Sequence, residues 1–372
     1  MQDRSSPTRV LWLAKGLGPG GMERLLVNHA IAGDRERFTY EAAYMVDRPN
    51  SVIGELESHG VVCHKLGTGG RFDVSWVTGL RRLLRDRRID VVHVHSPLPA
   101  AVARVVARTL PHRPRVVYTE HNSWTCYSWP TRIANAVTYP LDDAQIAVSE
   151  AARQSAVAPL RSRVEVLTHG IDLSGARGHR DERAAVRAEL GVDDTTVVAI
   201  TIANLRTEKA YDVLLDAAAI ALEQEPRLLF LGVGHGPLQA ELGARHAELG
   251  LGDRFRFLGF RSDAQRLLAG SDIFVLSSRE EGLPVSLMEA MAVGLPVVAT
   301  AVGGIPDYVR SGVDGVLVEP EHADRLAAAI VSVAGDDARR KEMGVAAETV
   351  ADAFDARVAV ARIDDIYDGV RA

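Results

Sequence analysis

Cysteine is scarce in this sequence, and long apolar runs are missing altogether. Cys63 and Cys126 are its only cysteines, too few for a disulfide framework or a cysteine-based zinc site. No run reaches the ~18 apolar residues of a membrane-spanning helix, and the amino-terminal residues lack the apolar core of a secretory signal. We therefore expect a cytoplasmic protein that folds in a reducing compartment.

Neither sign of charge dominates, but the charge is unevenly distributed along the chain. Residues 1–170 hold 22 Lys and Arg against 16 Asp and Glu, and residues 171–372 hold 21 against 33, so the balances are +6 and −12. A basic first half suits an anionic acceptor or an anionic lipid surface, and we expect no nucleic-acid partner. The length of 372 residues indicates two domains, at ~100–200 residues each.

One stretch in the second half has a regular alternation of element types. Ile273 to Leu276 is an apolar run long enough for a buried strand, and Val285 to Val293 holds good helix formers. Gly294 and Pro296 end that helix, and a second apolar run continues to Thr300. A strand, loop, helix and strand in this order predict a parallel sheet.

Two acids lie in that unit at positions suited to a ligand. Glu281 follows the first strand, where open parallel sheets bind ligands, and Glu289 lies about two turns into the helix. The helix start at Leu283 to Ser286 offers free N–H groups to a phosphate. Together these features describe a site for a nucleotide sugar. The alternative is that both acids are solvated residues near a helix start.

The spacing is similar to a known signature. The Glu281 to Glu289 spacing, E-x7-E, lies within E-G-L-P-x-S-x-x-E-A-M-A-x-G-x-P-V-V-A-T and resembles family 4 of the retaining glycosyltransferases. The G-G-I-P-D run at Gly303 to Asp307 and the G-x-D-G-x-L-V run at Gly312 to Val318 extend the resemblance. It implies a GT-B fold, an α/β architecture with two Rossmann-like doubly wound parallel-sheet domains facing a cleft. It also implies transfer of a sugar from a nucleoside-diphosphate donor, of UDP or GDP type, to a hydroxyl acceptor in glycan, polysaccharide or glycolipid synthesis, the acceptor being lipid-linked or soluble.

Domain boundaries follow from the same resemblance. We expect an acceptor-side domain at residues 1–172 and a nucleotide-sugar domain at residues 173–353, with the terminal helix at residues 354–372 packing back on the first. The polar, Gly-containing stretch Ser174 to Asp181 is expected to be a linker.

A glycine-rich loop follows the first strand. Gly16, Gly18 and Gly21 spell G-x-G-x-x-G, a dinucleotide fingerprint that would suit an NAD(P)-dependent oxidoreductase. The resembled family has a G-G-x-E loop here that lies against the donor pyrophosphate, and Gly20 to Glu23 match it. Gly20 and Gly21 are therefore candidate donor contacts.

Histidines mark two strand ends in the first half. His93 and His95 alternate onto one face of the strand Asp90 to His95. A metal pair is one interpretation and buried hydrogen-bonded histidines are the other, which we favour because no third ligand is indicated. His121 follows the strand Arg115 to Thr119, and the resemblance places it near the donor sugar.

Basic residues follow the first strand of the second half. Asn204, Arg206 and Lys209 lie between the strand Val197 to Ile202 and the next helix, and Arg206 and Lys209 suit a pyrophosphate. The family usually has Arg where Asn204 stands, so Arg206 could take that role. Exposed loop charge is the alternative. With His121 and Glu281, Arg206 and Lys209 form the expected catalytic set. The remaining donor contacts that the resemblance implies are Gly234, Arg261, Gly282, Leu283, Pro284, Val285 and Glu289.

Several functional expectations remain open between classes. An oxidoreductase would leave Glu281, Glu289 and Lys209 unexplained, and a nucleotide-sugar epimerase would need no separate acceptor. A sugar-binding protein without catalysis is disfavoured because transport-type binding proteins are exported and no secretory signal is visible here. We expect no cofactor and no required metal, since Arg206, Lys209 and the helix starts can balance the pyrophosphate. The arginines of the helix Trp76 to Arg88, from Arg81 to Arg88, form either a solvated face or a peripheral membrane contact at the inner face of the membrane.

Overall fold

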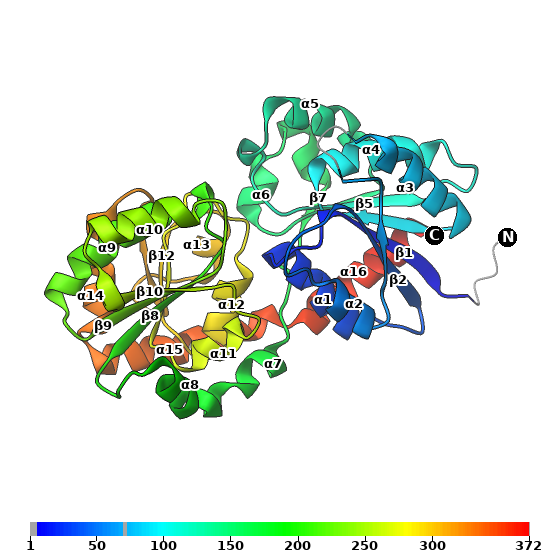
Figure 1. Ribbon diagram of the computed structural model, residues 1–372. Coiled ribbons are helices and arrows are strands. Elements are labelled where there is room, and N and C mark those ends of the chain that lie inside the picture. The colour runs from blue at the N-terminus through cyan, green and yellow to red at the C-terminus, as the bar shows by residue number, and fades with distance from the viewer. Residues whose placement is uncertain (1–5, 70–72, 372) are drawn as a thin grey trace. The chain divides into compact units, whose positions relative to one another are not determined.

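The computed structural model describes residues 6–69 and 73–371 and consists of two compact units (Figure 1). Unit 1 takes the described residues up to Gly170 and those from Ala356 on, and unit 2 is Ile171–Asp355. Each unit is a parallel sheet with helices on both faces.

Unit 1 contains a seven-stranded sheet in the order β3-β2-β1-β4-β5-β6-β7, and every pair of neighbouring strands is parallel. The strands are β1 (Thr8–Gly16), β2 (Phe38–Val46), β3 (Val62–Lys65), β4 (Val91–Val94), β5 (Arg115–Glu120), β6 (Ala144–Ala147) and β7 (Val164–Val166). The helices are α1 (Gly21–Ala32), α2 (Ile53–Ser58), α3 (Ser75–Asp86), α4 (Pro97–Arg108), α5 (Trp129–Thr138), α6 (Glu150–Ser155) and α16 (Ala356–Arg371), with 3-10 turns η1 (Trp124–Cys126), η2 (Tyr139–Leu141) and η3 (Ala158–Arg163).

Strand alternation explains how this sheet is covered on both faces. Leu11 and Leu13 of β1 pack with Leu80 and Leu84 of α3, whereas Trp12, between them, packs on the opposite face. Successive side chains of a strand point to opposite faces, so a strand buried on both faces becomes a continuous apolar run. Helix α16 covers the Trp12 face, with Ile363 and Tyr367 in that core cluster.

Unit 2 contains a six-stranded parallel sheet in the order β10-β9-β8-β11-β12-β13. The strands are β8 (Val197–Ile202), β9 (Leu228–Val233), β10 (Phe255–Gly259), β11 (Ile273–Leu276), β12 (Val297–Thr300) and β13 (Gly315–Val318). The helices are α7 (Leu173–Gly178), α8 (Arg183–Leu190), α9 (Tyr211–Gln224), α10 (Gln239–Glu248), α11 (Ala264–Ala269), α12 (Val285–Ala292), α13 (Ile305–Tyr308), α14 (Ala323–Ala334) and α15 (Asp337–Ala351), with 3-10 turns η4 (Arg180–Glu182), η5 (Thr207–Lys209), η6 (Gly252–Arg254) and η7 (Asp352–Phe354).

The predicted alternation of strand and helix is confirmed for the stretch from β11 to β12, but the expected linker is wrong. Ser174 to Asp181 forms α7 and the start of η4 instead of extended chain. The Asp172 side chain caps α7 by accepting from the Gly175 N–H at 3.0 Å, and Leu173 and Ala176 are buried. A cap and two apolar contacts are enough to order so short a helix.

The exposed arginines of α3 lie where the sequence predicted, with Leu80 and Leu84 buried beneath them. Within residues 6–69 and 73–371, no helix combines the length and the apolar character needed to cross a membrane.

Candidate functional site

The order of strands reverses at one point in the sheet of unit 2. Strand β8 is followed in sequence by β9 on one side, and β11 is followed by β12 on the other, while β8 and β11 are neighbours. Open α/β sheets bind ligands beyond the carboxyl ends of the two strands at such a point. The loop after β8 contains Lys209, and the loop after β11 contains Glu281.

These two loops are joined by an ion pair. The Lys209 Nζ lies 2.7 Å from both carboxylate oxygens of Glu281, and the Ser278 hydroxyl donates to Glu281 Oε1 at 2.7 Å. Glu281 is only 8% exposed. The Ser277 hydroxyl also donates to the carbonyls of Lys209 and Ala210 at 3.0 and 2.9 Å. The structure thus brings together two residues that the sequence singled out separately.

The start of α12 lies directly after Glu281. Pro284 is the N-cap residue and provides no side-chain cap. The Gly304 N–H donates to the Gly282 carbonyl at 2.6 Å, and Gly303 has φ +59°. A Cβ on Gly303 would clash with the Glu281 carbonyl oxygen, so only glycine permits this close approach. These contacts hold the start of the helix, from Gly282 through Leu283 and Pro284 to Val285, in place, and helix starts of this kind can bind anions.

Glu289 is buried on α12 at 6% exposure. It accepts a hydrogen bond from the Gln265 side-chain amide, which comes from α11. Gln265 was not predicted, because α11 itself was not recognised in the sequence.

The other residues of unit 2 that were predicted to contact the nucleotide sugar lie outside the Lys209–Glu281 pair. The Arg206 side chain is 52% exposed, and its nearest carboxylate, Glu208, is 3.9 Å away. The Asn204 carbonyl accepts from the Arg206 N–H at 2.9 Å. Gly234 has φ +146°, and a Cβ there would clash with the Ala203 carbonyl, so it allows the loops after β8 and β9 to touch. The Arg261 guanidinium is engaged by Asp263 at 2.7 Å and by a second carboxylate of α8.

Histidines gather at the strand ends of unit 1. His95 follows β4, and its Nδ1 lies 3.0 Å from Nε2 of His121, which follows β5. The rings of His93 and His95 have centroids 4.2 Å apart, and the His121 ring stacks on His169 at 5.5 Å. The sequence predicted His121 as a site residue and buried hydrogen-bonded histidines at His93 and His95. It gave no role to His169, although His169 also follows a strand end.

Burial keeps these imidazoles neutral. Desolvation, and next the neighbouring imidazoles, lower the pKa of His93, His95 and His121 well below the usual 6.5, and the same causes lower the pKa of His169 to about 4. A neutral imidazole can donate one hydrogen bond to a hydroxyl group and accept one from it. In the same strand β5, burial raises the pKa of Glu120 to about 7, although the Tyr118 hydroxyl donates to it at 3.0 Å.

The glycine-rich loop of unit 1 leads straight into α1. Gly20 is the N-cap residue and Gly21 is the first helical residue, with no side-chain cap. A Cβ on Gly20 would clash with the Glu23 carboxylate, so the Glu23 side chain folds over this helix start.

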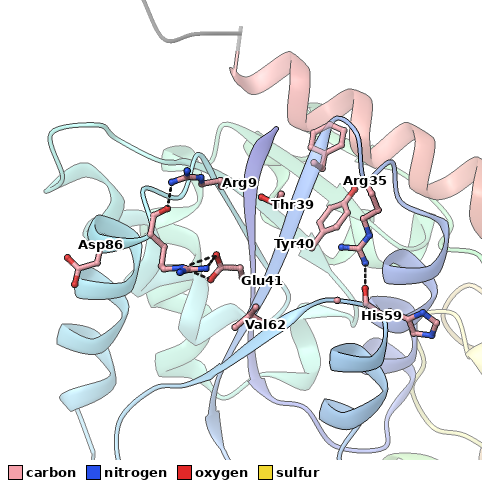
Figure 2. A pocket seen from close by; sticks show the side chains of 11 residues that line it. Arg9, Arg35, Thr39, Tyr40, Glu41, His59, Val62 and Asp86 are labelled. Atoms are coloured by element: carbon pink, nitrogen blue, oxygen red, sulfur yellow. Dashed lines mark hydrogen bonds and ion pairs between the residues drawn. The ribbon is translucent and has the colours of Figure 1, made fainter. Parts of the chain in front are cut away.

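A cavity of about 640 Å³ in unit 1 is not part of this arrangement (Figure 2). It opens at the amino ends of β1, β2 and β3, at the sheet edge opposite to the histidines. Its guanidinium groups bind protein acceptors: Arg87 pairs with Glu41, Arg9 donates to the Arg87 carbonyl at 2.9 Å, and Arg35 donates to the His59 carbonyl at 2.7 Å. These contacts hold the strand starts together.

No three His, Cys, Asp or Glu side chains of the described chain are arranged to hold a metal ion.

Comparison with known proteins assigns both halves of the chain. The family model of the glycosyl transferases group 1 matches residues 182–350, and that of Glycosyltransferase Family 4 matches residues 19–174. The chain belongs to the family 4 glycosyltransferases. The matched ranges together reach from the glycine-rich loop of unit 1 through α12 and most of α15 in unit 2.

Relatives and solved structures agree with this assignment. The N-acetyl-alpha-D-glucosaminyl L-malate synthase of Bacillus anthracis is 26% identical over 309 residues, covering 80% of this chain and 79% of the relative. The UDP-Gal:alpha-D-GlcNAc-diphosphoundecaprenol alpha-1,3-galactosyltransferase of Escherichia coli is 27% identical over 79% of each chain. Anabaena Alr3699/HepE, solved in complex with UDP-glucose, has a TM-score of 0.85 at 23% identity over 97% of this chain and 99% of its own.

The fold is GT-B, as the resemblance implied, and the chain is a glycosyltransferase of glycan synthesis. The relatives do not support the oxidoreductase and epimerase alternatives. The family model of the first half begins at residue 19 and so includes Gly20 and Gly21 of this loop.

Proposed function

We propose that this glycosyltransferase uses a nucleoside-diphosphate sugar, of UDP or GDP type, and transfers the sugar to a hydroxyl acceptor with retention and without a metal ion. The observation that carries the proposal is the Lys209–Glu281 pair, which joins the two loops at the strand-order reversal beside the uncapped start of α12. It places a cation, a carboxylate and free N–H groups in one loop cluster. The complex of Anabaena HepE with UDP-glucose supports the choice of donor.

Each group of unit 2 has a distinct part in this proposal. Lys209 and Arg206 balance the pyrophosphate, together with the N–H groups from Leu283 onward. Glu281 accepts hydrogen bonds from sugar hydroxyls, and Glu289 accepts them from the ribose. Two carboxylates already hold the Arg261 guanidinium. We therefore assign the contact with the base of the donor nucleotide to the backbone of the loop that contains Arg261.

We propose retention because no side chain in this scheme is assigned as a nucleophile or as a general base. Neither Glu281, which is assigned to the sugar hydroxyls, nor a neutral His121 is assigned as nucleophile or base. The acceptor oxygen attacks from the face that the pyrophosphate leaves, the bond from the anomeric carbon to the phosphate oxygen breaks, and a phosphate oxygen takes the acceptor proton. Lys209 and the helix dipole stabilise the leaving pyrophosphate. Proton couplings of the product's anomeric centre, compared with those of the donor, test this, and an inverted product would refute the mechanism.

Calorimetry tests the donor class. UDP or GDP should bind the full chain with measurable affinity, whereas ADP and NAD(P) should bind weakly or not at all. Tight NAD(P) binding with no binding of any nucleoside diphosphate would refute the proposal. Transfer in excess EDTA tests the metal, since full activity is expected there and loss that Mg²⁺ or Mn²⁺ restores would contradict it.

A lipid-linked acceptor is supported by the surface of α5. Trp129, Ile133 and Val137 recur every fourth residue and are 73%, 53% and 73% exposed. Neither α5 nor the adjoining α4 contains an acidic residue, and Arg132 of α5 and Arg108 of α4 are exposed. An apolar stripe with Trp and flanking arginines suits the surface of an anionic membrane. The relative from Escherichia coli is named for a diphosphoundecaprenol acceptor.

Vesicle sedimentation tests this contact. The protein should sediment with phosphatidylglycerol vesicles at low salt and stay in solution with phosphatidylcholine vesicles. Trp129→Ser with Ile133→Ser should abolish sedimentation, whereas the matched control Val345→Ser, at an exposed valine of unit 2, should not. Equal sedimentation of all variants would assign the membrane contact to another surface, such as the arginines from Arg81 to Arg88. No binding by the wild type would favour a soluble acceptor.

A further inference from the structure

His95 lies behind His121 and contacts it directly. It is 8% exposed, and its Nδ1 is 3.0 Å from the His121 Nε2. The two rings are 5.3 Å apart and inclined at 35°. His95 is buried and His121 half-buried, at the carboxyl ends of the neighbouring strands β4 and β5.

A neutral imidazole has one N–H and one lone pair, so this contact has two possible arrangements. In the first, the His95 Nδ1–H donates to a lone pair on the His121 Nε2, and the His121 proton is on Nδ1. In the second, the His121 Nε2–H donates to the His95 Nδ1, and the His95 proton is on Nε2. Burial, which lowers the pKa of both rings, excludes a doubly protonated ring at neutral pH.

The surroundings of His95 distinguish the two arrangements. Its Nε2 is buried and has no hydrogen-bond partner in residues 6–69 and 73–371. The second arrangement would leave an N–H unsatisfied there, and the first would leave a lone pair. Among backbone groups, a buried N–H without a partner is rarer than a buried carbonyl without one, and we apply the same preference to the imidazole. The first arrangement is therefore favoured.

The neighbouring rings prevent His95 from finding another partner. Both nitrogens of His93 are engaged, Nδ1 with the Tyr367 hydroxyl at 2.6 Å and Nε2 with the Thr119 hydroxyl at 2.7 Å. His93 therefore contacts His95 only through its ring, with the two planes inclined at 37°. His169 stacks against His121 with the planes inclined at 17°. The plane of His121 is fixed by contacts with both neighbouring rings.

We propose that His95 is a positioning residue that holds His121 in the Nδ1–H form. The Nε2 lone pair of His121 is then occupied by His95, and its Nδ1 carries a proton. His121 can donate one hydrogen bond to a sugar hydroxyl, but it has no lone pair with which to remove the acceptor's proton. His95 thereby excludes His121 as a general base, in agreement with transfer on the leaving-group face. The substrate in this statement rests on the proposed function, whereas the tautomer rests on the geometry alone.

Nitrogen NMR of the full chain, labelled with ¹⁵N-histidine, tests the tautomer without substrate. A protonated ring nitrogen and one with a lone pair have separate ¹⁵N shifts, and His121→Asn identifies the His121 signals by their loss. We expect the proton of His121 on Nδ1. A proton on Nε2 would overturn the proposal.

Two variants test the consequence for turnover. His95→Leu removes the donor and should give a mixture of His121 tautomers, with kcat lowered by at most about 10-fold, the effect of losing one hydrogen bond in every molecule. The donor KM should change by less than about threefold, because His95 is not assigned to the donor. His95→Asn keeps a side-chain donor near the Nδ1 position and should restore the single tautomer and most of kcat.

The outcomes separate this inference from the proposed function. If His95→Leu keeps both the tautomer and kcat of the wild type, His95 does not position His121 and the inference is wrong. If His95→Leu does not fold, the spectrum of the wild type still decides the tautomer. A wild type with the proton on Nδ1 that binds no nucleoside diphosphate would support the inference and refute the proposed function.

Discussion

Both units place polar side chains beyond the carboxyl ends of a parallel sheet, yet the chemistry of these side chains differs. In unit 1 they are buried or half-buried imidazoles whose lowered pKa values keep them neutral. In unit 2 they are a lysine and a glutamate paired at 2.7 Å. One architecture thus supplies two environments, one without formal charge and one with it.

The difference matches the two tasks of glycosyl transfer. A leaving pyrophosphate carries negative charge, which a cation and a helix start can stabilise. Hydroxyl groups of a sugar or an acceptor need hydrogen-bond partners but no charge. The Lys209 ammonium group is held by the buried carboxylate of Glu281. A pyrophosphate that binds there would compete with Glu281 for this ammonium group.

Removing the cation of unit 2 should have the largest effect. Lys209→Met should lower kcat/KM by about 10²–10³-fold, the usual cost of losing one group that stabilises transition-state charge. Steady-state kinetics with the matched control Lys341→Met, at an exposed lysine of α15, checks this result. A loss below about tenfold would mean that Arg206 or the helix start is sufficient for the pyrophosphate.

Lowering the pH should have the next largest effect, because it should destabilise unit 1 before unit 2. A histidine with a lowered folded pKa stays neutral while its unfolded form gains a proton near pH 6.5, so its stabilising contribution is present above that pH and is lost as the pH falls. The raised pKa values of Glu120 (about 7) and Asp142 (about 6) act in the opposite direction. The histidines of unit 1 outnumber these two acids: His93, His95, His121 and His169. We therefore expect unit 1 to lose stability as the pH falls below about 6.5.

Unit 2 should resist the same change. The pKa values of its carboxyls Asp212 and Asp263 are lowered by Arg279 and Arg261, so their stabilising contributions persist until the pH falls below about 4. Hydrogen exchange, corrected for the intrinsic pH dependence, should show β5 losing protection between pH 7 and 5 while β11 keeps it. Loss of protection in β11 first would contradict the prediction.

The sequence allowed the local parts of this architecture to be predicted. The apolar run of β11 and the helix formers of α12 lie next to each other, so their order needs no knowledge of the rest of the chain. Glu281, Glu289 and Lys209 could be proposed individually, from their places after strands or on a helix and from the resemblance.

Contacts between distant segments could not be predicted in the same way. Lys209 and Glu281 are 72 residues apart, and their pairing depends on β8 lying beside β11. The contact of His95 with His121 likewise requires β4 beside β5. The helix α7 was missed because its order comes from the Asp172 cap and two buried side chains and not from helix propensity.

Loss of one charge from the proposed ribose contact should have an intermediate effect. Glu289→Gln should raise the donor KM about 10- to 150-fold, because a hydrogen bond to a charged group contributes ~1.5–3 kcal/mol. Gln265→Leu, which removes the amide that orients Glu289, should give a smaller rise. The control Glu241→Gln, at an exposed position of α10, should leave the KM unchanged. An unchanged donor KM in Glu289→Gln would show that Glu289 does not touch the nucleotide.

Removing the neutral donor of unit 1 should have the smallest effect. His121→Ala deletes one uncharged hydrogen bond, which contributes ~0.5–1.5 kcal/mol, so kcat should fall by about tenfold and not be abolished. His59→Ala, at an exposed histidine of the same unit, is the matched control and should behave as the wild type. The pH dependence of the wild type provides a second measurement. Because the pKa of His121 lies well below 6.5, His121 should stay neutral from pH 8 to pH 6.5, and kcat should not change over this range. A loss beyond about 10³-fold, together with an acid limb in that range that His121→Ala abolishes, would identify His121 as a general base. The environment of unit 1 would then take part in proton transfer, and the division between a charged and an uncharged environment would not hold.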